Sequence, residues 1–500
     1  MMRKRSAQKP ILLFCLISSL LILLLCTKSS PLYPLNDWED ANIIFTVGKG
    51  MTQGKVPYRD LFDQKGPFAF LLFAVASLIS GTSFTGLYIL EVLSFTFFLY
   101  WSYKTVSLYE SRNAFLCIPL LGMLVASAMS FAHGGSVEEL FLPAYAFSFY
   151  ELLRCIREDA AVGKIRLVLH GFLAGCMFWA KYTLTGFYIG WLLLLFLCLL
   201  SRRRIGTAFG SVFLFLAGMA AASVPWLIYY FAHHALPELW RYYFFNNIAG
   251  YGSAEENSPL LAVFSIIRMT GATLFRNPQY SVLIATGILY LLLSRKTSRS
   301  FLERISPAVL FLFAAAGIYA GGTGYRYYGI VLTMFACLGW IPLFRLLNRS
   351  SFSGRLAETI PAVAGAGLTL LVSVALCLPL SSNTYMLRMK KQDLPQYRFA
   401  EIMRSDSTNG SGTLLSYHMM DAGFYLAIDD IPDFRCFTWL NSATEEILQE
   451  QNSYLNNPEI EFVVTRNRQY PIEGFSVISE ASYFYEEDIQ TYYLYQRRKS

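Results

Sequence analysis

Five apolar runs constrain the fold of this 500-residue chain more than any other feature. They lie at residues 114–132, 183–200, 205–232, 327–344 and 359–381. Each has about the length that a helix needs to cross the roughly 30 Å hydrocarbon core of a membrane. Charged residues make up only 15% of the chain, whereas ordinary soluble domains carry about 25%. The sequence therefore predicts an all-α polytopic membrane protein.

The distribution of Lys and Arg predicts how the chain is threaded through the bilayer. Basic clusters lie in short loops at Arg3–Arg5, Arg154–Arg166, Arg202–Arg204, Arg295–Lys296 and Arg345–Arg355. They alternate with loops that are poorer in Lys and Arg, which is the positive-inside pattern of membrane proteins. The net charge of +7 is thereby explained without a nucleic-acid partner.

A short apolar stretch, Pro67–Ser80, is expected to lie along the outer membrane surface rather than to cross the bilayer. About eleven spans then follow, at 11–27, 84–103, 114–132, 138–153, 165–180, 183–200, 205–231, 279–293, 305–322, 327–344 and 359–381. This assignment keeps every basic cluster in the cytoplasm. If Pro67–Ser80 crossed instead, each later basic loop would move outside. We therefore predict a multi-pass plasma-membrane domain at 1–382, with a first outer loop at 27–83.

From residue 383 onward the composition changes, and alternating patterns replace the long apolar runs. Strands are expected at Thr413–Met419, Arg435–Trp439, Glu461–Thr465 and Thr491–Gln496, and helices at Phe399–Arg404 and Thr444–Leu455. Residues 383–500 are thus predicted to form a small soluble α/β domain on the outer face.

Polar side chains gather at the ends of spans that are expected on the outer side. The first outer loop carries Asp37, Glu39, Asp40, Asp60, Asp63 and Lys65, and later stretches carry Glu138, Glu139, Lys181, Arg326 and Tyr328. A charged side chain at mid-bilayer costs roughly 2.5–3.5 kcal/mol. Each stretch alone is compatible with a solvated loop, but their common side predicts a water-filled cavity at the outer surface.

Several cofactor motifs are absent from the sequence. It has no GxxxxGK[ST] loop and no HExxH, and "NGSGTLL" (Asn409–Leu415) precedes a strand instead of following one. The nine cysteines include no C-x-x-C pair, so neither a zinc site nor a disulfide framework is indicated. An enzyme with this sequence would not hold a nucleotide.

The first outer loop has the pattern D-x4-F-x2-GKGM-x2-G-x2-PY-x-DLFDQKGP, and "GGSVEE-x3-P" and "KYTLTG" follow at Gly134 and Lys181. Together these motifs resemble bacterial GT-C glycosyltransferases of the family 39 type, which include protein O-mannosyltransferases and lipid A aminoarabinose transferases. The resemblance covers about residues 1–345. It departs at Tyr325–Tyr328, where "YRYY" stands in place of the "F-x-HY" of many relatives.

The resemblance implies an inverting transfer of a sugar from a polyprenyl phosphate to an extracytoplasmic glycan, lipid or protein. Asp40 would be the general base, because it precedes Met51 as the family's Asp precedes its Met or Ile. Glu138 or Glu139 would be a second acid that orients the acceptor or a divalent cation. The substrate-binding residues would be Asp37, Glu39, Asp60, Asp63, Lys65, Lys181, Arg326 and Tyr328, with the three cations serving the donor phosphate.

Two other functions are compatible with a polytopic chain. A transporter or flippase of lipid-linked glycans would carry charged residues within its spans and helices broken by Gly or Pro near mid-bilayer, whereas these spans are nearly free of charge. A membrane anchor whose only working part is the C-terminal domain would leave the outer-loop motifs without a role.

Overall fold

The computed structural model describes residues 8–247, 259–349, 362–406, 413–440, 445–485 and 488–498. The chain divides into two compact units. Unit 1 comprises Met1–Thr27, Leu90–Trp226 and Gly252–Ser382, and unit 2 comprises Lys28–Ile89, Leu227–Tyr251 and Asn383–Ser500. The first outer loop therefore belongs to the same unit as the C-terminal domain, although the segment Lys28–Ile89 ends far before Asn383 in the chain.

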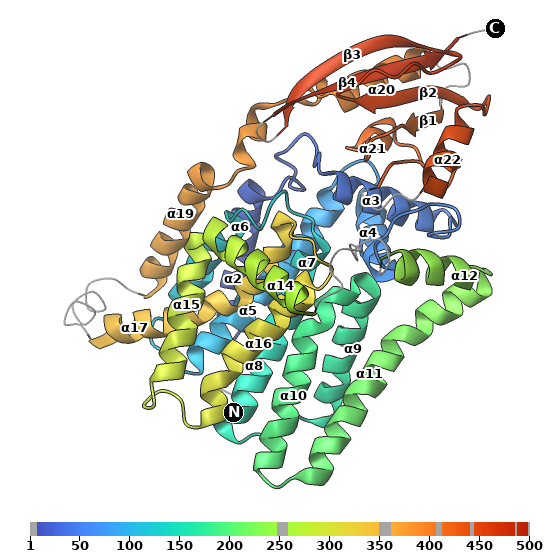
Figure 1. The fold of residues 1–500 in the computed structure, drawn as a ribbon. Coiled ribbons are helices and arrows are strands. Elements are labelled where there is room, and N and C mark those ends of the chain that lie inside the picture. Colours follow the sequence, from blue (N-terminus) through green and yellow to red (C-terminus); the bar gives the residue numbers. More distant parts are fainter. Residues whose placement is uncertain are drawn as a thin grey trace. The chain divides into compact units, whose positions relative to one another are not determined.

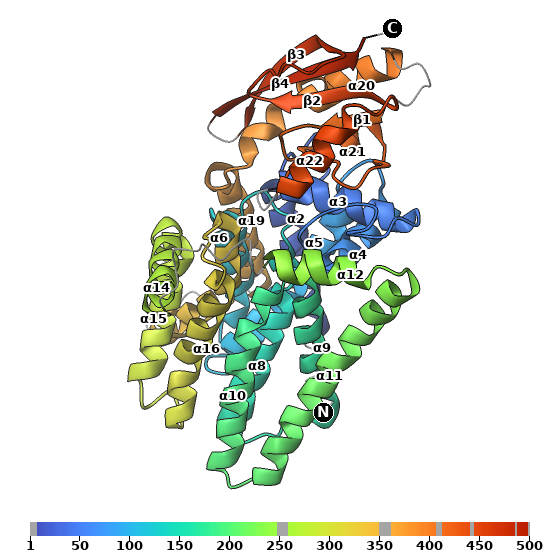
Figure 2. The same cartoon turned by 45° about the vertical axis from the view of Figure 1, so that its right-hand side comes forward.

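Unit 1 is helical. Its elements are α2 (Gln8–Cys26), most of α5 (Thr85–Ser107), η1 (Ala114–Leu116), α6 (Cys117–Ala126), α7 (Val137–Leu140), α8 (Leu142–Glu158), α9 (Lys164–Ala180), η2 (Tyr182–Thr185), α10 (Gly186–Ser201), most of α11 (Ile205–Ala232), α14 (Pro259–Arg276), α15 (Pro278–Leu293), α16 (Phe301–Tyr319), η4 (Arg326–Gly339), α17 (Trp340–Arg349) and α19 (Ala362–Leu380). In both ribbon views α8, α10 and α16 run side by side (Figures 1 and 2). Within the described residues, eight helices are long and apolar enough to cross a membrane. The predicted polytopic helical class is confirmed.

Small residues allow two of these helices to approach each other closely. A Cβ atom on Gly171 of α9 would lie 1.9 Å from the Phe215 carbonyl oxygen of α11. A Cβ atom on Gly218 of α11 would lie 2.1 Å from the Val168 carbonyl oxygen. Backbone contact of this kind is how membrane helices associate in a solvent as apolar as their own side chains.

One helix in unit 1 differs from the sequence-based assignment. Residues 232–278 were expected in an outer loop, but Pro259–Arg276 forms α14, which is among the helices suited to cross a membrane. Its apolar side chains face outward: Leu260 is 80% exposed and Phe275 is 87% exposed. The segment was missed because Arg268 and several small polar residues interrupt its apolar run.

A further crossing at α14 would reverse the sidedness of every later segment, so the position of the C-terminal domain is open to a direct test. We expect an alkaline phosphatase fusion after Asn383 to be active and a fluorescent cytosolic reporter at the same site to be dark. This result would show that the number of crossings before Asn383 is odd, as predicted. An inactive phosphatase with a bright cytosolic reporter would place the C-terminal domain in the cytoplasm and contradict the predicted topology.

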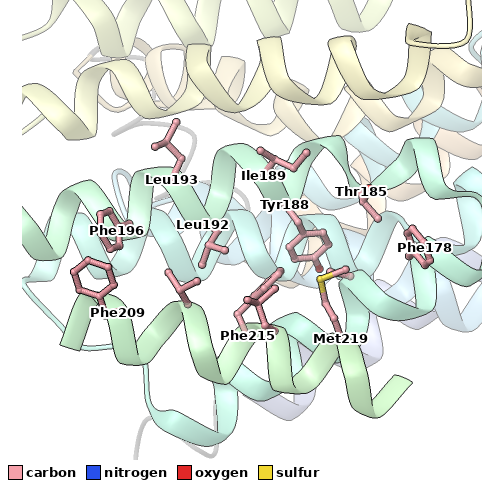
Figure 3. A pocket seen from close by; sticks show the side chains of 13 residues that line it. Phe178, Thr185, Tyr188, Ile189, Leu192, Leu193, Phe196, Phe209, Phe215 and Met219 are labelled. Carbon is pink, nitrogen blue, oxygen red and sulfur yellow. The ribbon is translucent and has the colours of Figure 1, made fainter. Parts of the chain in front are cut away.

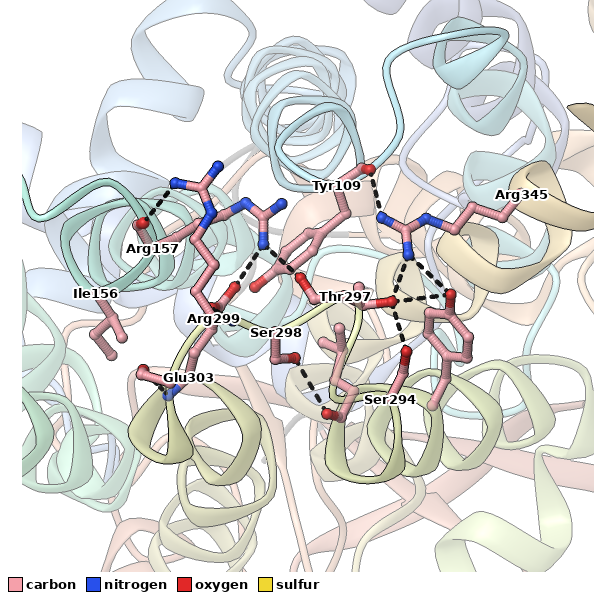
Figure 4. Close-up of polar contacts among 12 residues, drawn as sticks. Tyr109, Ile156, Arg157, Ser294, Thr297, Ser298, Arg299, Glu303 and Arg345 are labelled. Carbon is pink, nitrogen blue, oxygen red and sulfur yellow. Dashed lines mark hydrogen bonds and ion pairs between the residues drawn. The ribbon is translucent and has the colours of Figure 1, made fainter.

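Some of the basic residues that were taken as markers of cytoplasmic loops have structural partners in unit 1. Arg157, at the end of α8, donates to Glu303 Oε1 at 2.8 Å and to the Thr297 carbonyl at 2.9 Å (Figure 4). Arg345 of α17 donates to the Tyr109 carbonyl at 3.1 Å and also to the hydroxyl of the same Thr297. Glu303 is fully buried, and buried charges are tolerated when they are paired in this way. The polar network therefore ties the ends of α8, α16 and α17 together.

Unit 2 contains the first outer loop and the C-terminal domain. Its elements are α3 (Glu39–Thr52), α4 (Pro67–Ile79), α12 (Leu236–Glu238), η3 (Leu239–Phe245), η5 (Thr384–Arg388), η6 (Lys391–Asp393), α20 (Pro395–Asp406), β1 (Thr413–Ser416), α21 (Phe424–Ile428), α22 (Glu445–Tyr454), β2 (Ile460–Arg466), β3 (Phe475–Tyr485) and β4 (Asp488–Arg497). The sheet has the order β1-β2-β4-β3. Strands β1 and β2 are parallel, and the other pairs are antiparallel. Its core includes Leu415, Ile460, Val463, Phe475 and Tyr495.

The expected strands and helices of this domain are present except for one strand, and one strand is present that was not expected. Arg435–Trp439 is irregular: Ser416 N donates to the Phe437 carbonyl at 3.3 Å and Trp439 N donates to the Met419 carbonyl at 2.9 Å, without a continuous ladder. Strand β3 was not predicted. It is an edge strand whose polar and apolar residues do not alternate regularly. Thr444, the first residue of one expected helix, lies outside the described residues.

Candidate functional site

Asp40 lies in the first turn of α3. Trp38 occupies the N-cap position in an extended conformation, and an indole ring has no acceptor with which to close the first turn. The free backbone N–H groups and the helix dipole therefore act on the side chains that follow, and both favour an ionised carboxylate. The recurrence of Ile43, Ile44, Val47 and Met51 at helical spacing predicts a helix over residues 40–51 with one apolar face. In the structure Ile43, Ile44 and Val47 are buried and Met51 is half-buried.

Lys65 is the direct partner of Asp40 in unit 2. Its Nζ lies 3.0 Å from Asp40 Oδ2, and the two side chains keep 10% and 14% of their surface exposed. The turn that carries Lys65 is closed by Tyr58, whose hydroxyl donates to the Lys65 carbonyl at 2.6 Å. Asp60 helps to hold the same turn by accepting from Val56 N at 2.7 Å. Hydrogen bonds from Arg59 lower the pKa of Asp60.

Asp63 is buried beside this pair. Its Oδ1 accepts a hydrogen bond from Gln64 N at 2.6 Å. Its Oδ2 is buried and has no hydrogen-bond partner among the residues that the structure describes. Burial raises the pKa of Asp63 to about 6; the charge of Lys65 opposes this shift, and that of Asp40 adds to it. The carboxyl group therefore titrates close to neutral pH next to the predicted base.

This shift predicts a pH-dependent effect of Asp63→Asn on stability. The pKa of Asp63 is about 6 in the folded protein, against an ordinary value of 3.8. Between about pH 4 and pH 6 the folded protein therefore binds a proton that the unfolded chain does not, so the free energy of unfolding falls as the pH rises through this range. The loss above pH 6 is on the order of 3 kcal/mol. We expect Asp63→Asn to melt at a higher temperature than the parent at pH 7.5 and at a similar temperature at pH 4. Thermal unfolding in detergent at both pH values measures this; equal melting at pH 7.5 would contradict it.

Asp37 and Glu39, which precede Asp40, are held by partners in the same unit. Lys28 Nζ lies 2.7 Å from Asp37 Oδ1, and both side chains are fully buried. Burial lowers the pKa of Lys28, but the charges of Asp37 and Tyr385 and the hydrogen bonds to both together outweigh this effect and hold the pKa above its ordinary value. Glu39 forms an ion pair with Arg466, the last residue of β2. Their predicted role in substrate binding stays a prediction.

The second group of predicted site residues lies in unit 1. Lys181 follows α9, and its Nζ lies 2.5 Å from Glu138 Oε1. The same ammonium lies 3.4 Å from the centre of the Tyr328 ring, which is cation–π geometry. Glu138 retains 3% of its side-chain surface and Lys181 retains 15%. The structure thus brings together three residues that were predicted from three separate stretches. Arg326 is exposed at the start of η4.

Glu139 is placed differently from Glu138. The backbone N–H of Glu139 donates a hydrogen bond to the Ser136 hydroxyl at 3.1 Å, and the Glu139 Oε2 accepts one from Gly135 N at 3.1 Å. The carboxyl group of Glu139 lies next to the carboxyl group of Glu91 on α5. Glu91 is fully buried and accepts a hydrogen bond from the Thr27 hydroxyl at 3.0 Å. Glu139 is thus enclosed, and Glu138 is the member of the pair that faces a cation.

The sequence analysis missed Glu91, Lys28 and Arg466. A lone carboxylate inside an apolar span is a recognised signal of a functional or paired group, so Glu91 could have been found. Arg466 has no such signal, because a basic residue at the end of a strand is ordinary. Within the described ranges, no group of three or more His, Cys, Asp or Glu side chains is suited to hold a metal ion.

An apolar groove lies between α9, α10 and α11 in unit 1, with a cavity volume of about 630 Å³. Figure 3 shows Phe178, Tyr188, Leu192, Phe215 and Met219 among the side chains that line it. Thr185 also lines the groove, four residues after Lys181. The groove therefore offers an apolar surface close in sequence to the Glu138–Lys181 pair.

The apolar helices define a multi-pass membrane protein, and its fold is a GT-C fold. The fold is shared with two crystal structures of ArnT from Cupriavidus metallidurans, one bound to undecaprenyl phosphate and one in the apo state. Each matches with a TM-score of 0.60 over 98% of both chains, at 13% and 12% sequence identity respectively. No protein-family model and no curated protein sequence matches the chain. At these identities the similarity establishes the fold.

Proposed function

We propose that the protein is a membrane glycosyltransferase that moves a sugar from a polyprenyl-phosphate donor to an acceptor outside the cytoplasm. The observation that carries this proposal is the Asp40–Lys65 pair at the start of α3, within the loop that resembles the first outer loop of GT-C enzymes. A carboxylate held ionised by a helix N-terminus is suited to take a proton from an acceptor hydroxyl. The predicted orientation would place this pair at the outer surface.

The donor side of the proposal rests on unit 1. ArnT from Cupriavidus metallidurans has been crystallised with undecaprenyl phosphate, and this chain has the same fold. The groove between α9, α10 and α11 would hold part of an isoprenoid chain, since its lining is almost wholly apolar. Lys181, and Arg326 at the start of η4, would neutralise the phosphate, because a cation stabilises the negative charge that develops on a leaving phosphate.

The reaction would be a single displacement. The acceptor oxygen loses its proton to Asp40 and forms a bond to the anomeric carbon of the sugar. The bond from that carbon to the phosphate oxygen breaks on the opposite face, and the polyprenyl phosphate leaves with the bonding electrons. One displacement inverts the anomeric configuration. A divalent cation, if one takes part, would be bound by Glu138 together with groups from the substrate.

Mass spectrometry of cell-envelope glycans, lipids and proteins from a deletion strain tests the proposal. We expect one envelope molecule to lose the mass of a single sugar residue, and a plasmid copy of the wild-type gene to restore it. An Asp40→Asn copy that restores the sugar equally well would contradict the proposal. If the protein were a flippase, its deletion would instead leave the lipid-linked sugar on the inner leaflet. An Asp40→Asn copy would then restore the sugar as well as the wild-type copy does.

A further inference from the structure

We infer that the C-terminal sheet positions the catalytic base, and that Asp37 and Glu39 serve this purpose instead of contacting substrate. This inference rests on the proposed function, in which Asp40 is the base. The residues concerned are Arg466 at the end of β2 and Tyr483 and Tyr485 on β3. They donate hydrogen bonds to Asp37 and Glu39, the two carboxylates just before Asp40, which lie more than 420 residues earlier in the chain.

Asp37 is the more deeply buried of the two anchors. Its Oδ1 accepts from Lys28 Nζ at 2.7 Å, and its Oδ2 accepts from the Tyr483 hydroxyl at 3.1 Å. Lys28 also donates to the Tyr385 hydroxyl at 3.2 Å. Both carboxylate oxygens of Asp37 are therefore engaged, and its side chain is fully buried. A carboxylate so enclosed is suited to hold a chain segment in place and has no open side for a sugar.

Glu39 is the second anchor and the first residue of α3. Its Oε1 accepts from Arg466, and its Oε2 accepts from the Tyr485 hydroxyl at 3.3 Å. The two oxygens are thus bound by two different strands of the sheet. Asp40 is the next residue along the helix, so its Cα is one peptide unit away from an anchored position.

No N-cap side chain accepts a hydrogen bond from the first turn of α3, although the Asn42 side chain donates to the Asn36 and Trp38 carbonyls at 2.8 Å. A Ser, Thr, Asp or Asn at the N-cap would accept a hydrogen bond from the first turn and stabilise it by about 1 kcal/mol. This chain has Trp38 at that position. The contacts from the sheet therefore add to the local contacts that fix Asp40, and a displacement of about 1 Å at a catalytic group can cost about 100-fold in rate.

Other ion pairs in unit 2 join the first loop to the C-terminal domain without touching this turn. Lys55 lies 2.6 Å from Asp433, whose side chain is 80% exposed. Exposed pairs of this kind contribute about 0–1 kcal/mol. Lys55→Gln is therefore a matched control, because it removes a contact to the same domain but leaves both anchors of Asp40 in place.

The test compares steady-state transfer by purified full-length Arg466→Gln, Tyr483→Phe and Lys55→Gln proteins. We expect kcat to fall about 10- to 100-fold in the first two variants, with KM for donor and acceptor unchanged within about twofold, and Lys55→Gln to match the parent. Thermal unfolding of each variant verifies that the protein is folded at the assay temperature. A rise in KM with kcat unchanged would overturn the inference and assign the anchors to substrate binding.

A double-mutant cycle separates failure of this inference from failure of the proposed function. If Arg466 acts through Asp40, Arg466→Gln should reduce kcat no further in an Asp40→Asn background, because groups that act as a unit are not additive. Equal losses in both backgrounds would show that Arg466 acts independently of the base and would overturn the inference. Full activity of Asp40→Asn alone would instead refute the proposed base.

Discussion

Purified Asp40→Asn protein is expected to transfer sugar about 10²- to 10⁴-fold more slowly than the parent, which is the usual contribution of general-base catalysis. Asn keeps a side-chain oxygen in the first turn of α3 and has nearly the same shape. It has no charge and cannot accept the acceptor proton. The substitution removes the carboxylate that lies 3.0 Å from Lys65 Nζ, but it leaves Lys65 itself, which the family resemblance assigns to the donor phosphate, unchanged.

The competing explanation is that Asp40 only favours the start of the helix. The substitution would then have little effect on rate, because a polar oxygen near the first turn remains. Asp429→Asn is a suitable control, since Asp429 pairs with Lys49 near the other end of α3 and is 54% exposed. Near-normal transfer by Asp40→Asn, with Asp37→Asn or Glu39→Gln inactive through a fall in kcat, would show that another carboxylate is the base.

Lys181→Gln is expected to have the second large effect, on both donor binding and stability. The substitution leaves the Glu138 carboxylate 97% buried with no opposite charge, since Glu138 retains only 3% of its side-chain surface. Removing one member of a buried ion pair costs about 3–5 kcal/mol. The same substitution removes the ammonium that we assign to the donor phosphate, and its cation–π contact with Tyr328.

A double variant separates the two effects of Lys181. In Lys181→Gln/Glu138→Gln neither charge remains, so we expect most of the lost thermal stability to return. Affinity for a polyprenyl phosphate, measured by titration of the detergent-solubilised protein, should stay weak in both variants. Unchanged affinity in the stable double variant would remove Lys181 from the donor site and leave it as a structural partner of Glu138.

The sequence predicted most of the elements that carry the candidate site. The helix that begins beside Asp40 was expected from the recurrence of Ile43, Ile44 and Val47, because helical periodicity is a local property of the chain. The acidic and basic stretches were also found. Their grouping was not: the pairing of Lys181 with Glu138, and of Lys65 with Asp40, depends on where separate helices and turns end in space.

Two errors show where local reasoning fails. Helix α14 was missed because Arg268 and several small polar residues interrupt its apolar run. Strand β3 was missed because an edge strand has one neighbour and weak alternation. Strand β3 is stabilised by its pairing with β4, which the local pattern does not reveal.

By itself the sequence determined the class of protein, the apolar helices and the residue types available for acid–base chemistry, because hydrophobic periodicity and charge act over one or two helical turns. Only the tertiary structure decided which carboxylates are accessible and which are enclosed. Asp37, Glu39 and Asp40 are close in sequence and similar in chemistry, yet two are bound by strands from the C-terminal domain and one faces Lys65. That distinction arises from contacts between segments more than 420 residues apart, whose pairing is set by packing and buried charge compensation.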